Sequence, residues 1–162
     1  NRKYDTARFY ESVALLRTWF DRPGITTDLI VGFPGETEAE FAQTLEFVRA
    51  CGFAEMHIFP YSIRTGTPAA KMEQVPKAVK EERSARAAEV AAALNRRYLS
   101  GCVGETYPVL YEQEAEGLWT GHAPNYILVG AKGQNLHNQV RRTKITGVQG
   151  NLLVGELEET DV

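Results

Sequence analysis

Two short stretches of this sequence carry residue types that could bind a small charged molecule. The first, residues 27–37, is Thr-Asp-Leu-Ile-Val-Gly-Phe-Pro-Gly-Glu-Thr, an apolar run that ends in two glycines and a carboxylate. Glycines let a ligand approach the backbone closely, and N–H groups at the start of a helix bind anions. The alternative is an ordinary turn between a strand and a helix, and composition alone favours this alternative because a Gly-x-x-Gly pair is a weak signal.

The second stretch, residues 58–69, is Ile-Phe-Pro-Tyr-Ser-Ile-Arg-Thr-Gly-Thr-Pro-Ala. It holds several hydroxyl groups and Arg64, whose planar guanidinium suits a carboxylate or a phosphate. The alternative is an exposed loop with a solvated arginine. His57 lies just before it, and a lone histidine in a strand is more often a hydrogen-bonded structural residue than a catalyst.

Helices and strands are predicted to alternate around both stretches. Apolar spacing and capping patterns predict helices over residues 5–20 and 37–50. Apolar runs at 29–31 and 56–59 predict strands, and the first is apolar on both sides, as in parallel strands buried on both faces. This order is typical of a parallel α/β sheet or barrel, whose ligands bind at the carboxyl ends of the strands. Two strands are too few to close such a barrel, which takes about 250 residues.

A long helix and a strand-rich tail follow. Pro76 is a favourable first residue for a helix that runs to about residue 99. Short strands then alternate with glycine-containing turns, at residues 106–111, 118–120, 126–129, 140–146 and 152–157. Five short strands favour a small antiparallel β-barrel. The predicted organisation is part of a parallel α/β barrel, a linker helix and a β-barrel domain, over residues 1–75, 76–101 and 102–162 respectively.

Length and composition restrict the class of protein. The chain has 162 residues, of which 43% are hydrophobic and 24% charged, and this is a globular composition. No apolar run approaches the roughly 20 residues that span a bilayer, so we expect no membrane partner. Cys51 and Cys102 are too few for a four-ligand zinc site or an iron–sulfur cluster, and two reduced thiols are favoured over one disulfide. The net charge of −3 is too mild to identify a partner.

Basic and aromatic residues of the tail could contact RNA. Arg142 and Lys144 share one face of a predicted strand by its period of two, and Arg141 lies opposite. Trp119 and Tyr126 could stack on unpaired bases or fill the core of a small barrel, and for Trp119 the core is favoured.

Two further arginines, Arg96 and Arg97, lie near the end of the long helix, where they would extend a phosphate-binding surface or cap the helix carbonyls. The tail itself is acidic, with 4 basic and 8 acidic residues over 102–162. Because phosphate contacts set salt-dependent affinity, we expect RNA binding to be weak and salt-sensitive.

Several of these stretches together resemble one enzyme family. The chain resembles the C-terminal half of the radical S-adenosylmethionine methylthiotransferases in Asn1-Arg2-Lys3-Tyr4, TTDLIVGFPGET at 26–37, HIFPYSIRTGTPAA at 57–70 and Gln74-Val75-Pro76. The tail resembles their TRAM domain, an RNA-binding β-barrel. The resemblance covers essentially the whole chain, and its two long motifs are specific together.

Three branches of that family differ in substrate. The His-Ile-Phe-Pro-Tyr-Ser form, with His57 and Pro60, most resembles the enzymes that add a methylthio group to position 2 of N6-threonylcarbamoyladenosine, next to the tRNA anticodon. The branch that acts on isopentenyladenosine is the next nearest. The branch that modifies a ribosomal-protein aspartate typically has an acidic residue at the position of Arg64, so this arginine favours tRNA.

The resemblance also implies roles for single residues. It places a set of loop and strand residues at the S-adenosylmethionine pocket: Gly32, Phe33, Pro34, Gly35, Glu36, His57 and Arg64. For Glu36 the alternative is that it only complements the dipole of the following helix. Arg2 would lie at the same barrel mouth and contact cofactor or RNA, or else be a solvated terminal charge.

Complete members of the family hold two 4Fe–4S clusters on two sets of three cysteines, which Cys51 and Cys102 do not match. We therefore expect a fragment with no catalytic residue, no cluster and no turnover, from a cytoplasmic enzyme that binds the tRNA anticodon stem-loop through its TRAM domain. Exposed barrel edges could pair with a second copy of the chain. Two other classes stay open: a non-catalytic RNA-binding module, and a small-molecule α/β enzyme, which lacks a nucleophile–base pair here.

Overall fold

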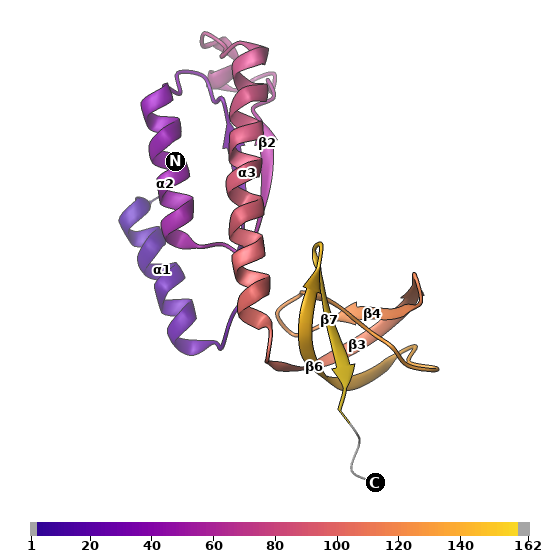
Figure 1. The fold of residues 1–162 in the computed structure, drawn as a ribbon. Helices are drawn as coiled ribbons and strands as arrows, with labels where there is room; N and C mark the ends of the chain where they lie inside the picture. The colour runs from indigo at the N-terminus through magenta and orange to yellow at the C-terminus, as the bar shows by residue number, and fades with distance from the viewer. Residues whose placement is uncertain (1–2, 159–162) are drawn as a thin grey trace. The chain divides into compact units, whose positions relative to one another are not determined.

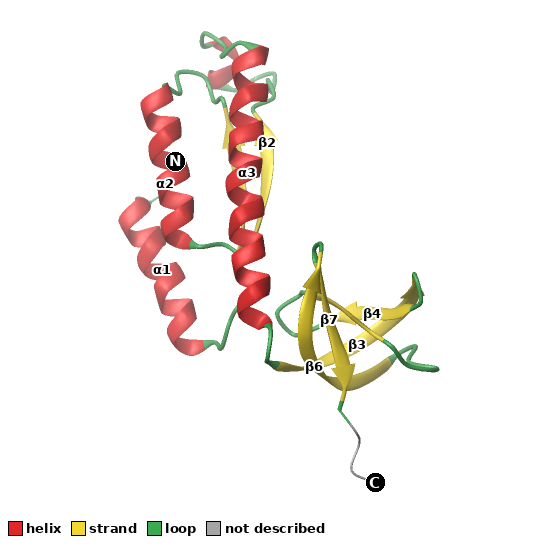
Figure 2. Ribbon diagram, in the orientation of Figure 1, coloured by secondary structure: helices red, strands yellow, loops and turns green. Residues whose placement is uncertain are grey.

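The helices and strands belong to two compact units (Figure 1 and Figure 2). The structure, a computed structural model, describes residues 3–158. The first unit comprises the described residues up to Phe20 together with Ile25–Asn95, and the second comprises Asp21–Gly24 and the described residues from Arg96 onward. Helix α3, Lys77–Cys102, begins in the first unit and ends in the second. Within residues 3–158, no helix is long and apolar enough to cross a membrane.

The first unit has a two-stranded parallel sheet with helices between and after the strands. In chain order its elements before α3 are α1 (Thr6–Trp19), β1 (Thr26–Val31), α2 (Glu38–Cys51), β2 (Glu55–Pro60) and a 3-10 helix (Pro68–Lys71). Thr37 and Glu40 form the predicted capping box at the start of α2, and Gly52 ends that helix with φ of 64°. The alternation of helices and strands that the sequence predicts is confirmed.

The predicted burial of β1 on both faces is wrong. Val31 is fully buried in a core that also contains Phe41 and Val90, whereas the neighbouring Ile30 is 54% exposed. In β2 the same alternation leaves Phe59 51% exposed. Successive side chains of a strand point to opposite faces, and in the described residues the core lies on only one of them. The other face, which we call the open face, presents side chains of both strands.

The second unit contains a closed five-stranded barrel in the order β3-β4-β5-β7-β6. Its strands are β3 (Thr106–Ala115), β4 (Leu118–His122), β5 (Leu128–Ala131), β6 (Gln139–Gln149) and β7 (Leu152–Leu157). The barrel is not wholly antiparallel as predicted, because β5 and β7 pair in parallel. Strand β3 is antiparallel to both β4 and β6, which are in turn antiparallel to β5 and β7, so β5 and β7 both run in the direction of β3.

The barrel has its own core. Val109, Val129 and Leu153 are fully buried, and the buried hydroxyl groups of Tyr111 and Thr143 lie 2.8 Å apart. One strand boundary differs from the prediction: Tyr126 lies before β5 instead of within it, because its φ of 63° is incompatible with a strand. The mixed α/β character follows from the sequence, and both units have a separate hydrophobic core.

Candidate functional site

The glycine turn between β1 and α2 folds back on itself through Glu36. Gly32 and Gly35 have φ of 68° and 85°, a region that non-glycine residues rarely adopt. The backbone N–H of Gly32 donates to Oε2 of Glu36 at 2.7 Å, and the N–H of Glu36 donates to the carbonyl of Phe33 at 2.9 Å. These two N–H groups therefore serve the turn itself, and the exposed residues of the turn are Gly35 and Phe33, of which Phe33 is 45% exposed.

A buried arginine of α3 holds the same carboxylate. Arg83, 4% exposed, donates from Nη1 to Oε2 of Glu36 at 2.6 Å and to the Glu36 carbonyl at 3.0 Å. Its guanidinium carbon also lies 5.3 Å from the centre of the Phe41 ring. Charge-assisted bonds of this kind are stronger than neutral ones, so α3 fixes the shape of the glycine turn.

Lys80, one turn earlier on α3, joins the glycine turn to the loop after β2. Its methylene stem covers Gly32 so closely that a Cβ at Gly32 would overlap Cγ of Lys80. Its Nζ donates to the carbonyl of Tyr61 at 3.1 Å. The rings of Tyr61 and Phe33 meet edge to face with centroids 5.0 Å apart. The two stretches that the sequence singled out are thus neighbours, and Lys80 and Arg83 position them.

Of the other candidate residues of the first unit, His57 lies on the open face. His57 is exposed and is the register partner of Asp28, and the next pair on that face is Ile30 and Phe59. Arg64 is exposed in the loop beyond β2, where its carbonyl accepts a hydrogen bond from Oγ1 of Thr67 at 2.8 Å. This face offers apolar area for an aromatic ring, with ionisable groups at its margin. Arg2 lies outside the described residues.

The structure does not bring the two cysteines together as ligands of an iron–sulfur cluster. Cys51 belongs to the first core and Cys102 to the core of the second unit. Burial raises the pKa of the Cys51 thiol, which disfavours the thiolate form that binds metals. Within residues 3–158, no three His, Cys, Asp or Glu residues form a group that could hold a metal ion.

The basic strand of the second unit is partly neutralised. Arg142 donates from Nε to Oε2 of Glu158 at 2.8 Å, and Lys144 donates to the carbonyl of Gly104. The hydrogen bond from Arg142 lowers the pKa of the Glu158 carboxyl. Arg142 and Lys144 are exposed on one face of β6 and Arg141 is half-buried, in agreement with the predicted alternation.

The remaining candidates of the second unit differ in exposure. Arg96 and Arg97 are exposed on the last turns of α3. Trp119 is half-buried and packs against the barrel core, whereas Tyr126 is 88% exposed. Of the two aromatic candidates, Tyr126 is therefore the one that presents a ring to solvent.

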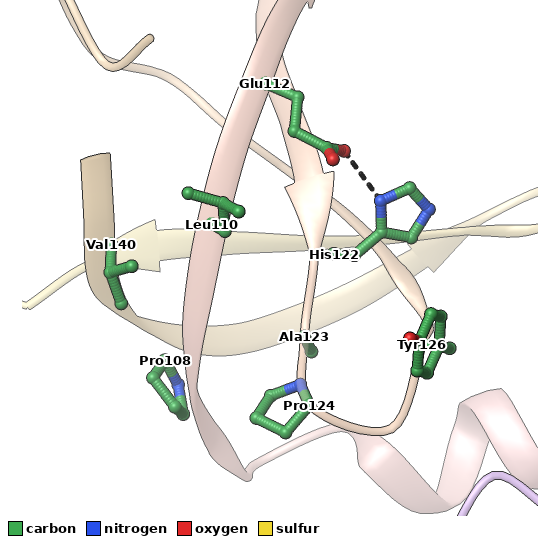
Figure 3. Close-up of a pocket in the computed structure, with 8 residues that line it drawn as sticks. All are labelled: Pro108, Leu110, Glu112, His122, Ala123, Pro124, Tyr126 and Val140. Atoms are coloured by element: carbon green, nitrogen blue, oxygen red, sulfur yellow. Dashed lines mark hydrogen bonds and ion pairs between the residues drawn. The ribbon is translucent and has the colours of Figure 1, made fainter. Parts of the chain in front are cut away.

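Tyr126 borders a concavity that the sequence did not suggest (Figure 3). Its volume is about 720 Å³, and it is lined by Pro108, Leu110, Glu112, His122, Ala123, Pro124, Tyr126 and Val140. Nδ1 of His122 and Oε2 of Glu112 lie 2.6 Å apart at its edge. The available signal was the alternation of β3, which places residues 108, 110 and 112 on one face.

Several proteins similar to this chain are named for one kind of reaction. A threonylcarbamoyladenosine tRNA methylthiotransferase of Bacillus subtilis is 38% identical over 151 residues, covering 89% of this chain and 34% of that protein. A tRNA-2-methylthio-N(6)-dimethylallyladenosine synthase of Chloroflexus aurantiacus is 38% identical over 90% of this chain and 32% of its own length. One of the same name from Erythrobacter litoralis is 42% identical over 84% of this chain and 31% of that protein.

No family model matches the chain. The chain spans about a third of the length of these curated relatives, since it covers 34%, 32% and 31% of them. Each match nevertheless includes both glycine-turn and barrel regions, because it extends over at least 84% of the chain. The chain is therefore a homologue of part of the tRNA methylthiotransferases, and this is the family to which it belongs.

Proposed function

We propose that the chain is part of an enzyme that adds a methylthio group to C2 of N6-threonylcarbamoyladenosine, next to the anticodon of tRNA. One observation carries the proposal: proteins named for this reaction class are 38% identical to the chain over 89% and 90% of its length. The radical S-adenosylmethionine mechanism and the cytoplasmic location that the family resemblance implies are parts of the same proposal.

The alternative substrate is dimethylallyladenosine, also called isopentenyladenosine. One relative of each name is 38% identical to the chain, and a second relative of the dimethylallyl name is 42% identical, so overall similarity does not favour the threonylcarbamoyl substrate. The His-Ile-Phe-Pro-Tyr-Ser string at residues 57–62 favours the threonylcarbamoyl substrate by its resemblance to that branch.

The first unit would bind S-adenosylmethionine at the glycine turn and the open face. Bound there, the cofactor would supply the methyl group and the radical that the family's chemistry requires. The exposed ring of Phe33 offers a stacking surface for the adenine, and Arg64 offers a guanidinium for the carboxylate. Glu36 holds the turn that presents Phe33, with Arg83 behind it. Gly32, Pro34, Gly35 and His57 complete the proposed set.

The residues of this chain do not fit an iron–sulfur cluster. Cys51 and Cys102 lie in separate cores, so they cannot share one cluster without unfolding a unit. Both 4Fe–4S clusters of the parent would therefore be held by cysteines outside these residues, and the chain alone would not turn over substrate.

The second unit would act as the TRAM domain and hold the anticodon stem-loop. Phosphates would be contacted by four exposed basic residues: Arg96, Arg97, Arg142 and Lys144. Tyr126 would stack on a base. Trp119 would support the barrel, since it packs against the core. With few basic groups and Glu158 already paired to Arg142, the affinity would be low and salt-dependent.

The substrate is tested with the full-length parent protein. Its clusters are reconstituted and it is incubated with S-adenosylmethionine, a reductant, a sulfur donor and tRNA that carries either modified adenosine. Nucleosides are then identified by mass spectrometry. We expect the methylthio derivative of N6-threonylcarbamoyladenosine. Its absence, with the dimethylallyl derivative formed instead, would establish the alternative.

A further inference from the structure

We propose that the concavity beside Tyr126 binds one unpaired nucleobase of RNA and prefers guanine. The inference rests on the proposed function, which takes RNA as the ligand of the second unit and stacks Tyr126 on a base. It adds a defined pocket, a base class and a role for Glu112 and His122.

The Tyr126 ring is presented to solvent by a fixed turn. It is 88% exposed, and its backbone has φ of 63°, which is uncommon for a residue other than glycine. Two hydrogen bonds hold the turn: the N–H of Tyr126 donates to the carbonyl of Ala123 at 2.9 Å, and the N–H of Ala123 donates to that of Ile127 at 3.0 Å. Left-handed backbone at a bulky residue tends to occur at binding sites. The ring is thus positioned without being used by the core.

The floor beside this ring is apolar and unusually exposed. Leu110 and Val140 are direct register partners on β3 and β6, and they are 41% and 63% exposed. Pro108 continues the same face, and Figure 3 shows Tyr126 and His122 on one side of the concavity with Val140 and Pro108 on the other. An apolar floor with an aromatic side wall suits the flat face of a base, which gains from stacking.

One edge of the concavity is polar. Oε2 of Glu112 lies 2.6 Å from Nδ1 of His122, and both side chains are 46% exposed. A carboxylate has two oxygens and accepts several hydrogen bonds, so the pair with His122 leaves acceptor capacity on Glu112. Guanine presents two adjacent donors, N1–H and the N2 amino group, which match a carboxylate; uracil presents one N–H between two carbonyls. Glu112 therefore favours guanine.

A cation lies where the phosphate of a bound nucleotide would be. Arg142 is the register partner of Pro108 and follows Val140 by two residues on the same face of β6. Two residues along a strand span about 7 Å, roughly the distance from a base to a neighbouring phosphate. The Arg142 side chain is 67% exposed and so is accessible despite its ion pair with Glu158. A strand of RNA can place its base on the floor and its phosphate on this arginine.

The test is fluorescence anisotropy with a labelled single-stranded RNA of about seven nucleotides, uridine throughout except for a central guanosine. Tyr126→Asn removes the ring and keeps a residue that tolerates positive φ, whereas Tyr126→Phe keeps the ring. Tyr10→Asn, at a tyrosine of the first unit that is 45% exposed, is the matched control. We expect Tyr126→Asn to raise the Kd at least about fivefold, and Tyr126→Phe and Tyr10→Asn to keep a Kd within about twofold of that of the unsubstituted chain.

Base preference is measured with the same RNA lacking the guanosine. Glu112→Gln is expected to lower the preference for the guanosine RNA by about fivefold or more, because one carboxylate acceptor is lost. The proposal is overturned if the unsubstituted chain binds neither RNA, or if Tyr126→Asn and Tyr126→Phe have the same Kd. It is also overturned if an apolar peptide binds and displaces the RNA. Unchanged amide NMR spectra of the barrel confirm that the variants fold. Because no methylthio product is measured, this outcome is separate from that of the proposed reaction.

Discussion

We predict that one substitution that breaks the buried ion pair between Arg83 and Glu36 greatly lowers the free energy of unfolding. The two side chains are 5% and 14% exposed, and the charged atoms are 2.6 Å apart. Arg83→Met keeps much of the length of the side chain and removes its charge. Removing one partner of a buried pair costs about 3–5 kcal/mol, since the other charge is left buried without compensation. Glu36 retains the N–H of Gly32 at 2.7 Å, so we expect the low end, about 3 kcal/mol.

The assay is urea unfolding followed by methyl NMR signals of Val48 and Leu153, which lie in the cores of the first and second unit. Separate signals are needed because two units do not guarantee a two-state transition. Arg86→Met is the matched control, since Arg86 binds Glu38 at 2.7 Å with side chains 37% and 58% exposed. Such an exposed pair contributes at most about 1 kcal/mol. If Arg83→Met and Arg86→Met lower the free energy of unfolding equally at the Val48 signal, the conclusion that the buried Arg83–Glu36 pair stabilises the first unit is refuted.

Three further predictions concern the glycine turn, the barrel and RNA. Gly32→Ala is expected to lower the free energy of unfolding by more than Gly66→Ala, because both have positive φ but only Gly32 has Lys80 against it; equal losses in urea would contradict this. The pKa of the Glu158 carboxyl is lowered in the folded chain, so its ionised form stabilises the barrel at pH values above the ordinary pKa of 4.5. This contribution is lost as the pH falls below 4.5, so Glu158→Gln should flatten the acid side of the pH–stability curve. Binding of tRNA by the chain should be weak and fall steeply with salt, and Arg142→Gln should reduce the slope of log K against log salt by about 1; an unchanged slope would exclude a phosphate contact there.

Local patterns in the sequence were enough to predict where the helices and strands lie. The capping box at Thr37 and the glycine at 52 set both ends of α2, and these patterns depend only on neighbouring residues. The burial of β1 was not predictable, because Ile30 and Val31 are equally apolar and only the set of packed neighbours decides which one is covered. The turn at Tyr126 was missed for a similar reason: its φ is fixed by hydrogen bonds around Ala123 and Ile127, which short apolar strings do not reveal.

The role of Glu36 shows why site residues are harder to predict than elements. A carboxylate at the start of a helix is compatible with cofactor contact, with the helix dipole and with an ion pair, and the partner that distinguishes them, Arg83, lies 47 residues later in the chain. Because Glu36 also binds the N–H of Gly32, a Glu36 variant that lost S-adenosylmethionine binding would not identify a ligand contact. Arg83→Met alters the same turn from behind, so comparison of the two variants separates the roles. If both weaken cofactor binding equally, Glu36 acts by holding the turn; a larger loss from Glu36→Gln alone indicates direct contact.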